Sequence, residues 1–367
     1  MKNIVRTITV FFALLLLAAA CGSGEQEAAE TTASTTTTTT EAPSTTEAPP
    51  TTEAPTTTEV PDIGPVYPLT GEPLEDGNSP DHPAVVIKVS NNDATARAAL
   101  QGLNEADVVF EERIEQSSTR FASVFHSVLP EEVGSVRSGR TSDVQIVANL
   151  NRPIFAFSGA NDGVHGQIRR AQTDGLLVRA SADFADPQFR RISDFSAPNN
   201  LVVNAAALLS KAEDGEAPLP IFDYSDNVSS LGDPSAGARV EASSPASYVW
   251  SSTDGGYLRF QGTEPHVTRD GFQITPRNVV VLTTTYVPSQ IDSSSVDAIT
   301  IGSGPVVIYS GGFRVEGTWT REYERDPFTF TTADDVVIGL AAGQTWVSLT
   351  PAGTSSDLSL KQADELR

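Results

Sequence analysis

The stretch SDVQIVANLNRPIFAFSGANDGVHGQIRRAQ, residues 142–172, sets a helical period, a short apolar strand and a second helical period one after another. Ser142 and Gln145 fit a capping box, in which the Ser hydroxyl accepts a bond from the Gln amide and the Gln side chain returns one. Apolar residues then recur at helical spacing until Pro153 ends the helix. Ile154–Phe157 is typical of a buried strand, and a small-residue turn leads into the helix VHGQIRRAQ. This alternation predicts an α/β layer.

Further strands are predicted upstream of this stretch. Residues 84–89 form a short apolar run of the strand type, and residues 97–103 predict a helical turn. Residues 107–114 alternate between two faces, and residues 119–128 are apolar, aromatic and β-branched. The last two segments are expected to pair as a hairpin, which completes a mixed α/β domain over residues 67–210.

Strand signals dominate the second half of the chain. Residues 211–247 are rich in Pro, Gly, Ser and acidic residues, which indicates a domain linker or a long loop. Residues 248–260 predict two strands around a Gly turn, and the strand-like runs NVVVLTTTYV, PVVIYSGGFRVEG, DVVIGL and TWVSL follow. We therefore expect an α+β or α/β protein, with an N-terminal mixed α/β domain, a β-rich domain over residues 248–352 and a tail over residues 353–367.

The N-terminus predicts export and a lipid anchor. Lys2 and Arg6 lie before an apolar run, Ile8–Ala20, that has the length of a secretory signal and is shorter than a spanning helix. Cys21 is the only cysteine, and the AAAC in which it stands resembles a lipobox, whose cysteine is acylated with fatty acids such as palmitate. We expect a signal peptide over residues 1–20, lipidation of Cys21 and a location on the extracytoplasmic face of the cell membrane. The alternative is a plain signal peptide followed by a chance cysteine.

Residues 21–66 are predicted to form a disordered tether behind the lipidated cysteine. The segment is built mainly of Thr, Pro, Ala and Glu, so burial cannot offset the entropy of ordering it. Because the signal segment carries +2 and the tether −8, the globular part keeps −17 of the chain's formal charge of −23. A body this acidic argues against nucleic acid as a partner and against adsorption to anionic surfaces.

The arginines are unevenly distributed. From Arg113 to Arg191 the chain has ten arginines, no lysine and eight acidic residues, and the guanidinium fork suits carboxylate and phosphate. Arg137 and Arg140 flank Ser138 just before the first predicted helix, where free amides and the helix dipole favour an anion. The turn SGANDG offers a second set of amides, so the sequence predicts an anion site at these two turns. The alternative is an internal ion pair between these arginines and one of three acids: Glu111, Glu115 or Asp143.

Metal, cofactor and nucleophile chemistry have weaker support. The four histidines share no metal-ligand spacing and Cys21 is expected to be acylated, so neither a metal nor a cofactor is predicted. A nucleophilic serine lacks the G-x-S-x-G signature, and Ser138 has no histidine near it in the sequence.

Several motifs resemble the YerB-like family of bacterial lipoproteins. They include PLTG, AVVIKVSNN, GLNEADVVFEERIE, STRFASVF, VGSVRSGR and QFRRISDFSAPNN in the first half, and VVIYSGGFRVEGTW and GQTWVSLTP in the second. The resemblance covers most of residues 68–351 and implies two adjacent domains of unknown function, the first ending near Asn204 and the second beginning near Tyr248. The family motif residues carried by this chain are Arg97, Glu111, Glu115, Arg120, Arg137, Ser138, Arg140, Arg191 and Asn200.

One position departs from the family pattern. The family usually has A-P-H-N where this chain has Ala197, Pro198, Asn199 and Asn200. If the family histidine is a general base, this chain lacks it, which argues against acid–base catalysis.

Three functional hypotheses follow from these patterns, and the third of them is a purely structural scaffold for another envelope protein. The first is a non-enzymatic, membrane-anchored lipoprotein that uses the motif residues to bind an anionic or carboxylate-bearing cell-wall component or an envelope protein. The alternative is an extracytoplasmic hydrolase or transferase acting on phosphate esters or wall polymers, with arginines stabilising the developing negative charge. In that case Glu111, Glu115 or His165 would serve as the base.

Overall fold

The computed structural model describes residues 65–74, 77–115, 118–212, 214–241 and 245–367. The predicted signal peptide, the lipidated Cys21 and the tether up to residue 64 lie outside these ranges. All described elements belong to the unit Pro61–Arg367. Within the described ranges, no helix combines the length and the apolarity that crossing a membrane requires.

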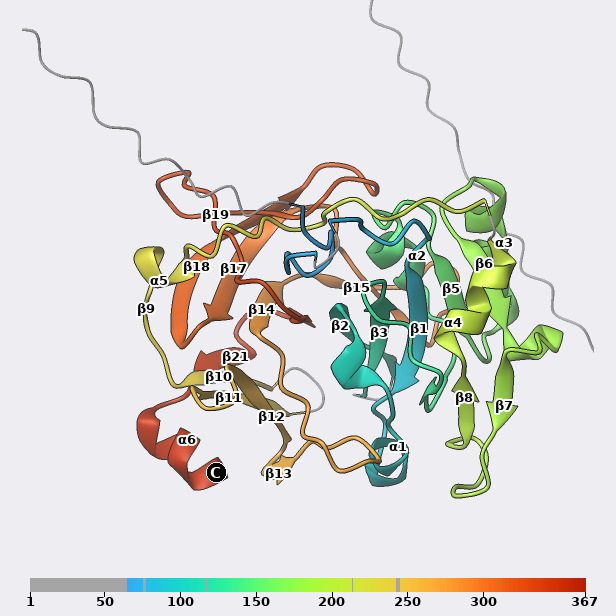
Figure 1. Ribbon diagram of the computed structural model, residues 1–367, viewed down its shortest axis with the longest axis horizontal. Helices are drawn as coiled ribbons and strands as arrows, with labels where there is room; N and C mark the ends of the chain where they lie inside the picture. Colours follow the sequence, from blue (N-terminus) through green and yellow to red (C-terminus); the bar gives the residue numbers. More distant parts are fainter. Residues whose placement is uncertain (1–64, 75–76, 116–117, 213, 242–244) are drawn as a thin grey trace, which may run out of the picture. The chain divides into compact units, whose positions relative to one another are not determined.

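One large sheet contains strands from both halves of the chain (Figure 1). Its strand order is β19-β18-β17-β14-β20-β2-β3-β1-β5-β6, and β9 pairs with β18 beside this path. The parallel β2–β20 ladder, from Val108↔Thr345 to Glu111↔Ser348, is the seam between the halves. The N-terminal strands are β1 (Val85–Ser90), β2 (Val108–Arg113), β3 (Thr119–Phe125), β5 (Ile154–Phe157) and β6 (Val178–Ser181). The C-terminal strands are β9 (Asp233–Pro234), β14 (Asn278–Thr283), β17 (Gly302–Ser310), β18 (Phe313–Arg321), β19 (Thr329–Thr331) and β20 (Thr345–Thr350).

Seven strands of this sheet run in the same direction, since β18 is antiparallel to β17 and β17 to β14. β1, β5 and β6 are parallel, as are β2, β20 and β14, and β3 is antiparallel to both β1 and β2. Their carboxyl ends therefore lie along one edge of the sheet, which we call the carboxyl edge. Ligands of open sheets with parallel strands commonly bind beyond such an edge. The residues that mark it are Ser90, Arg113, Phe157, Ser181, Thr283, Arg321 and Thr350.

Both faces of the large sheet are covered. On one face, α2 (Asp143–Val147) and α3 (Asp162–Thr173) share a core with Phe222 and Phe328 of the second half. On the other face, a five-stranded sheet of order β13-β12-β11-β10-β21 and a three-stranded sheet of order β4-β8-β7 join a second core. The fold class expected from the sequence is confirmed. The strands of these smaller sheets are β4 (Val133–Gly134), β7 (Phe189–Arg191), β8 (Leu201–Val203), β10 (Gly237–Val240), β11 (Ala246–Ser251), β12 (Gly256–Gln261), β13 (Glu264–Pro265) and β21 (Ser355–Asp357).

The predicted hairpin and the buried strand of the first half are present. β2 pairs with β3 in antiparallel register, and β5 has the predicted bounds. The helical turn expected at residues 97–103 lies earlier, as α1 (Ala94–Ala98), because the Asp93 side chain caps it by accepting from the Ala96 amide at 2.9 Å. A 3-10 turn, Leu103–Glu105, follows.

The predicted capping box at the start of α2 is wrong. The Ser142 hydroxyl accepts a bond from the Ala298 amide at 2.9 Å, and Gln145 Oε1 accepts one from the Thr300 amide, also at 2.9 Å. Both side chains are engaged by β16 (Val296–Ala298) and the residues after it, which form a hairpin with β15 (Tyr286–Pro288). Long-range bonds thus replace the local ones, and α2 is only five residues long.

The predicted linker and tail both contain ordered elements. Residues 211–247 include α5 (Val228–Leu231), β9 and β10, and residues 353–367 include β21 and α6 (Leu360–Leu366). β21 pairs with β10, so residues from the supposed linker and tail join one sheet. The run DVVIGL, predicted as a strand, forms a single bridge, Thr331↔Val337.

Candidate functional site

A loop inserted between β1 and β5 at the carboxyl edge positions the predicted arginines. β1 and β5 pair over Val85–Ile87, but beyond that point the segment 135–139 separates them. On one side the Arg137 amide donates to the Lys88 carbonyl at 2.9 Å. On the other side the Ser158 amide donates to the Arg137 carbonyl at 2.9 Å. This loop places Arg137 and Ser138 between the ends of two parallel strands, and Arg140 follows directly after it.

Arg120 meets these residues from the neighbouring strand. It lies opposite both Ser90 and Glu112 in the sheet, so its side chain shares their face. Only 3% of Arg120 is exposed, and its Nη1 donates to the Ser138 carbonyl at 3.2 Å. Burial, followed by the nearby Arg140 and Arg137 charges, lowers the pKa of Arg120 to about 9, so the guanidinium remains charged at neutral pH. We call Arg120, Arg137 and Arg140 the arginine cluster.

The buried guanidinium of Arg120 lacks a counter-charge in direct contact. Its Nε is buried without a hydrogen-bond partner, and it makes no ion pair within the described ranges. A buried charge without a partner is strongly disfavoured, whereas a bound anion would satisfy it.

Arg137 is also free of a carboxylate partner, whereas Arg140 is not. Arg137 is half-buried and donates from Nη1 to Asn199 Oδ1, a neutral acceptor, at 3.2 Å. Arg140 holds Glu115 with a fork of two bonds, one of them Nε to Oε2 at 2.9 Å. Although burial acts to raise it, the bond and the charge of Arg140 hold the pKa of Glu115 below its usual range. The internal ion pair considered for the sequence is therefore present at Arg140 and absent at Arg137, as far as the described residues go.

A buried charged triad lies on the same face of the sheet. Lys88 Nζ is 2.5 Å from Glu112 Oε1 and 2.7 Å from Asp143 Oδ1, and all three side chains are essentially inaccessible to solvent. Burial raises the pKa of Glu112 to about 7, against the lowering effect of Lys88 and with a further raising effect from Asp143. Lys88 is thus already engaged by two carboxylates and contributes no free charge to the arginine cluster.

Several amides at the two turns of the predicted anion site already have internal partners. The Gly159 amide donates to both Asp183 carboxylate oxygens, at 3.0 and 2.8 Å, and the Asn161 side chain caps the Val164 amide at 2.9 Å. At the start of α2 the Arg140 amide donates to Asp143 Oδ2 at 2.6 Å. Internal side chains therefore occupy the Gly159, Val164 and Arg140 amides, and these three are not available to a ligand.

Glu111 lies on the opposite face of the sheet and does not reach the cluster. Its carboxylate accepts from Arg259 Nη2 at 2.9 and 3.2 Å, from Trp346 Nε1 at 3.1 Å and from Thr119 Oγ1 at 2.8 Å. Arg259 and Trp346 are fully buried residues of the second half. The sequence suggests Glu111 as a ligand-binding residue or base, but the structure places it in a bond network that joins the two halves.

The other motif residues lie around the cluster. Arg191 Nη1 donates to Asn200 Oδ1 at 2.6 Å on the exposed β7–β8 hairpin, and Arg191 makes no contact with the cluster. Arg97 is half-buried on α1, where burial lowers its pKa and nearby Asp93 acts to raise it. Burial lowers the pKa of Arg137 as well, and Asp93 again acts to raise it, so Arg97 and Arg137 share this acidic neighbour.

Three residues near the arginine cluster were not predicted as site residues from the sequence. Asn199, noted only as a departure from the family pattern, is the partner of Arg137. Asp93 is a helix cap that lies near Arg137. Asp292, in the β15–β16 hairpin, lies near Arg140. The pKa of Asp292 is lowered mainly by its hydrogen bond with Ser294, and the charge of Arg140 lowers it further. No local signal could have found Asp292, because it approaches from the second half of the chain.

The bases required by the hydrolytic hypothesis are engaged elsewhere. Glu111 is held by Arg259 and Glu115 by Arg140. His165 Nε2 lies 3.6 Å from Asp183 Oδ2. Among the described residues, no group of three His, Cys, Asp or Glu side chains is arranged to hold a metal.

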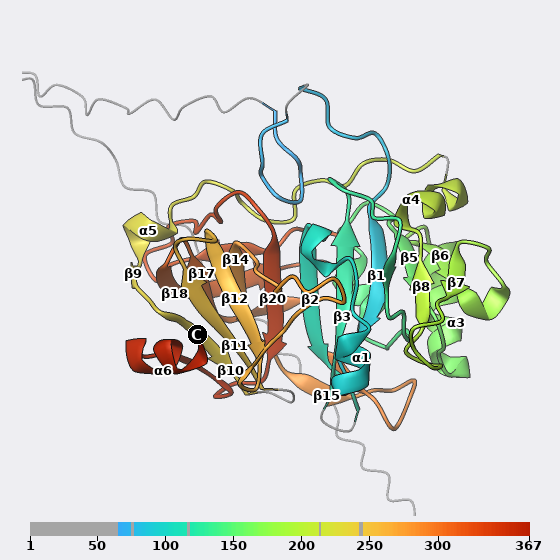
Figure 2. The ribbon, with the colours of Figure 1, turned by 60° about the horizontal axis from the view of Figure 1, so that its bottom comes forward.

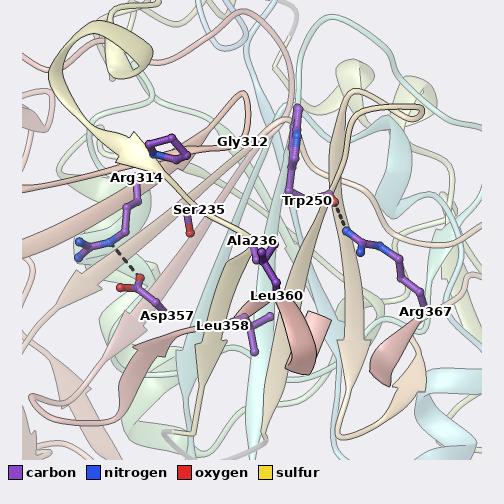
Figure 3. Close-up of a pocket in the computed structure, with 10 residues that line it drawn as sticks. Ser235, Ala236, Trp250, Gly312, Arg314, Asp357, Leu358, Leu360 and Arg367 are labelled. Atoms are coloured by element: carbon purple, nitrogen blue, oxygen red, sulfur yellow. Dashed lines mark hydrogen bonds and ion pairs between the residues drawn. The ribbon is translucent and has the colours of Figure 1, made fainter. Parts of the chain in front are cut away.

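A separate cavity of about 390 Å³ lies beside the C-terminal helix (Figure 3). Trp250, Leu358 and Leu360 line it, and its two cations already have internal partners. Arg314 Nε is 2.9 Å from Asp357 Oδ1, and Arg367 Nη2 donates to the Trp250 carbonyl at 2.6 Å. This cavity therefore offers a ligand an apolar wall and little free charge.

Comparisons with known proteins agree with the motif resemblance. Residues 69–217 match the family described as "Protein of unknown function (DUF3048) N-terminal domain", and residues 238–347 match its C-terminal domain. "Putative lipoprotein YerB" of Bacillus subtilis (strain 168) is 36% identical over 131 residues, which cover 36% of this chain and 37% of that protein's length. The crystal structure of the YerB protein from Bacillus subtilis superposes with a TM-score of 0.68 at 21% identity, covering 80% of this chain and 99% of that one. The predicted resemblance to the YerB-like family is confirmed.

Proposed function

This chain belongs to the DUF3048 family, and from that starting point we propose that it is a lipid-anchored extracytoplasmic protein whose arginine cluster binds an oxyanion of a cell-envelope component. The lipid anchor has support from the apolar segment before Cys21 and from the name of the Bacillus subtilis relative, which calls that protein a lipoprotein. The oxyanion is a carboxylate or a phosphate, the two groups that a guanidinium fork binds best.

The observation that carries the binding proposal is the buried guanidinium of Arg120. It is 3% exposed, its Nε has no partner within the described ranges, and two further arginines lie beside it. Three like charges at the end of a sheet repel one another, and in the part of the chain that the structure describes only Arg140 of the three has a carboxylate partner. An anion held between Arg120 and Arg137 would relieve that repulsion and supply the missing acceptor.

The ligand-binding test is a matched pair of arginine variants. In residues 61–367, Arg137→Gln removes a guanidinium bonded to Asn199, and the control Arg191→Gln removes one bonded to Asn200. Calorimetric titration with inorganic phosphate, and with a soluble peptidoglycan fragment that carries free carboxylates, measures binding in both. A hydrogen bond to a charged group contributes about 1.5–3 kcal/mol, so Arg137→Gln should weaken binding at least about tenfold and Arg191→Gln should leave it unchanged. Equal losses in the two variants, or no binding of either probe to the wild type, would rule out the site.

The lipid anchor is tested in cells. Radiolabelled palmitate should enter the wild-type protein and be absent from Cys21→Ser, and the membrane fraction should lose the variant protein. Label in both proteins would disprove acylation at Cys21.

A further inference from the structure

A second cavity lies at the seam between the two halves of the chain. It has a volume of about 550 Å³, which falls in the range of small-molecule sites. The parallel strands β2, β20 and β14 end beside it, at Arg113, Thr350 and Thr283, and the residues at and just after these ends line it. We call it the seam pocket. Figure 2 shows β15, which contributes Tyr286 to the pocket, beside the ends of β2 and β3.

The walls of the seam pocket are held by hydrogen bonds, one of which joins the two halves. The Tyr286 hydroxyl accepts from the Arg113 amide at 2.9 Å and donates to the Leu349 carbonyl at 3.0 Å. Trp319, another lining residue, donates from Nε1 to the Thr283 carbonyl at 2.8 Å, which fixes the position of the indole. Gly304 faces this indole so closely that a Cβ at that position would lie 2.8 Å from Trp319 Nε1. The cavity is therefore a built feature of the folded sheet.

Arg113 is the one charged residue among those that line the pocket. Its Nε is buried without a hydrogen-bond partner, and within the described ranges its side chain makes no ion pair. The two acids that precede it on β2 are already neutralised, Glu112 by Lys88 and Glu111 by Arg259. The pocket thus holds one uncompensated positive charge.

The rest of the lining is partly polar and partly apolar. Thr285 and Ser303 contribute exposed hydroxyl groups, whereas Ile299, Ile301 and Pro305 form an apolar wall. A site of this composition fits one anionic group at the arginine and an uncharged body along the wall.

We propose that the seam pocket binds a small molecule with one carboxylate or phosphate group, held by Arg113, and an apolar portion packed against Ile299 and Ile301. Since β2 belongs to the N-terminal half and β14 and β20 to the C-terminal half, the ligand contacts both family domains at once. This site is separate from the arginine cluster and does not depend on it.

The proposal is tested on residues 61–367, because both large hydrophobic cores consist of residues within this range. Suitable probes are phenyl phosphate, benzoate, inorganic phosphate and benzyl alcohol. The indole N–H signal of Trp319, assigned with Trp319→Phe, reports occupation by NMR, and Trp250 and Trp346 serve as internal references. We expect saturable shifts of Trp319 with phenyl phosphate or benzoate, weaker binding of inorganic phosphate and none of benzyl alcohol. The relative affinity of the first two probes distinguishes phosphate from carboxylate as the preferred group.

Variants separate this proposal from a structural role of Arg113 and from the arginine cluster. Arg113→Gln should weaken phenyl phosphate or benzoate at least about tenfold, Arg113→Lys should be intermediate, and Arg137→Gln should have no effect. Unchanged binding in Arg113→Gln, a loss in Arg137→Gln, or no saturable Trp319 shift with any anionic probe would overturn the proposal. The reference signals of Trp250 and Trp346 confirm that each variant is folded.

Discussion

Replacing Glu111 with glutamine tests whether this family residue joins the two halves of the protein or binds a ligand. In the structure its carboxylate faces the fully buried guanidinium of Arg259, with Nη2 at 2.9 and 3.2 Å from the two oxygens. Tyr248 and Trp346 also donate to it, at 3.3 and 3.1 Å. Glutamine keeps the size of the side chain, removes its charge and turns one acceptor into a donor that faces other donors.

The expected cost is large because the pair is buried. Removing one partner of a buried ion pair destabilises a protein by about 3–5 kcal/mol, since the remaining charge is left without compensation. A matched control is Glu115→Gln, which breaks the pair with Arg140 at a site where the Glu115 side chain is 28% exposed. For such a partly solvated pair the loss should be about 0–1 kcal/mol.

Urea unfolding of residues 61–367 measures both losses. Glu111→Gln should shift the midpoint strongly at an unchanged slope, and Glu115→Gln only slightly. Binding of the anionic probes should survive in Glu111→Gln under conditions where it is folded. A variant with nearly wild-type stability and no probe binding would show instead that Glu111 acts on the ligand.

Three further outcomes are expected. Folding raises the pKa of Glu112 to about 7, against 4.5 for the free side chain. Between these two pH values the folded protein binds more protons than the unfolded chain does. The stability of the wild type should therefore fall as the pH rises from about 4.5 to 7 and then level off. Glu112→Gln should lack this slope in urea unfolding at a series of pH values, and an identical pH profile would exclude the shift. Ser142→Ala leaves the buried Ala298 amide without its acceptor and should cost about 1–3 kcal/mol by the same assay, whereas no loss would mean that the hairpin is not held there. Gly304→Ala forces a Cβ against Trp319, so the free energy of unfolding should fall by about 1–3 kcal/mol and the Trp319 indole signal should shift. An unchanged stability and an unchanged signal would mean that the pocket is loosely packed at this point.

Local patterns in the sequence predicted much of the first half. The alternation of residues 107–114 identified β2, and the apolar run IFAF identified β5 to the residue, because both depend on side-chain periodicity. The strands β11 and β12 around a Gly turn were found for the same reason. The elements of residues 211–247 were missed because β9 and β10 are short and are stabilised by distant partners, β18 and β21.

The candidate site was predictable only in part. The spacing of Arg137 and Arg140 placed them at the carboxyl edge, and the family motifs added Arg120, but the ion pairs that distinguish these arginines involve remote residues. Glu111 meets Arg259 only after the β2–β20 ladder has formed, and Asp183 reaches the Gly159 amide from the end of another strand. Such contacts carry no periodic signal in a single sequence, so the sequence could not show which charges are already neutralised.

The binding of an oxyanion by the arginine cluster is tested most directly by the guanidinium Nε–H signals of residues 61–367 during an NMR titration with inorganic phosphate. We expect the signals of Arg120 and Arg137 to shift together, with one dissociation constant, while that of the exposed Arg191 stays in place. An Arg120 signal that does not respond, while exposed arginines shift in proportion to the phosphate added, would mean that the buried guanidinium serves the fold alone.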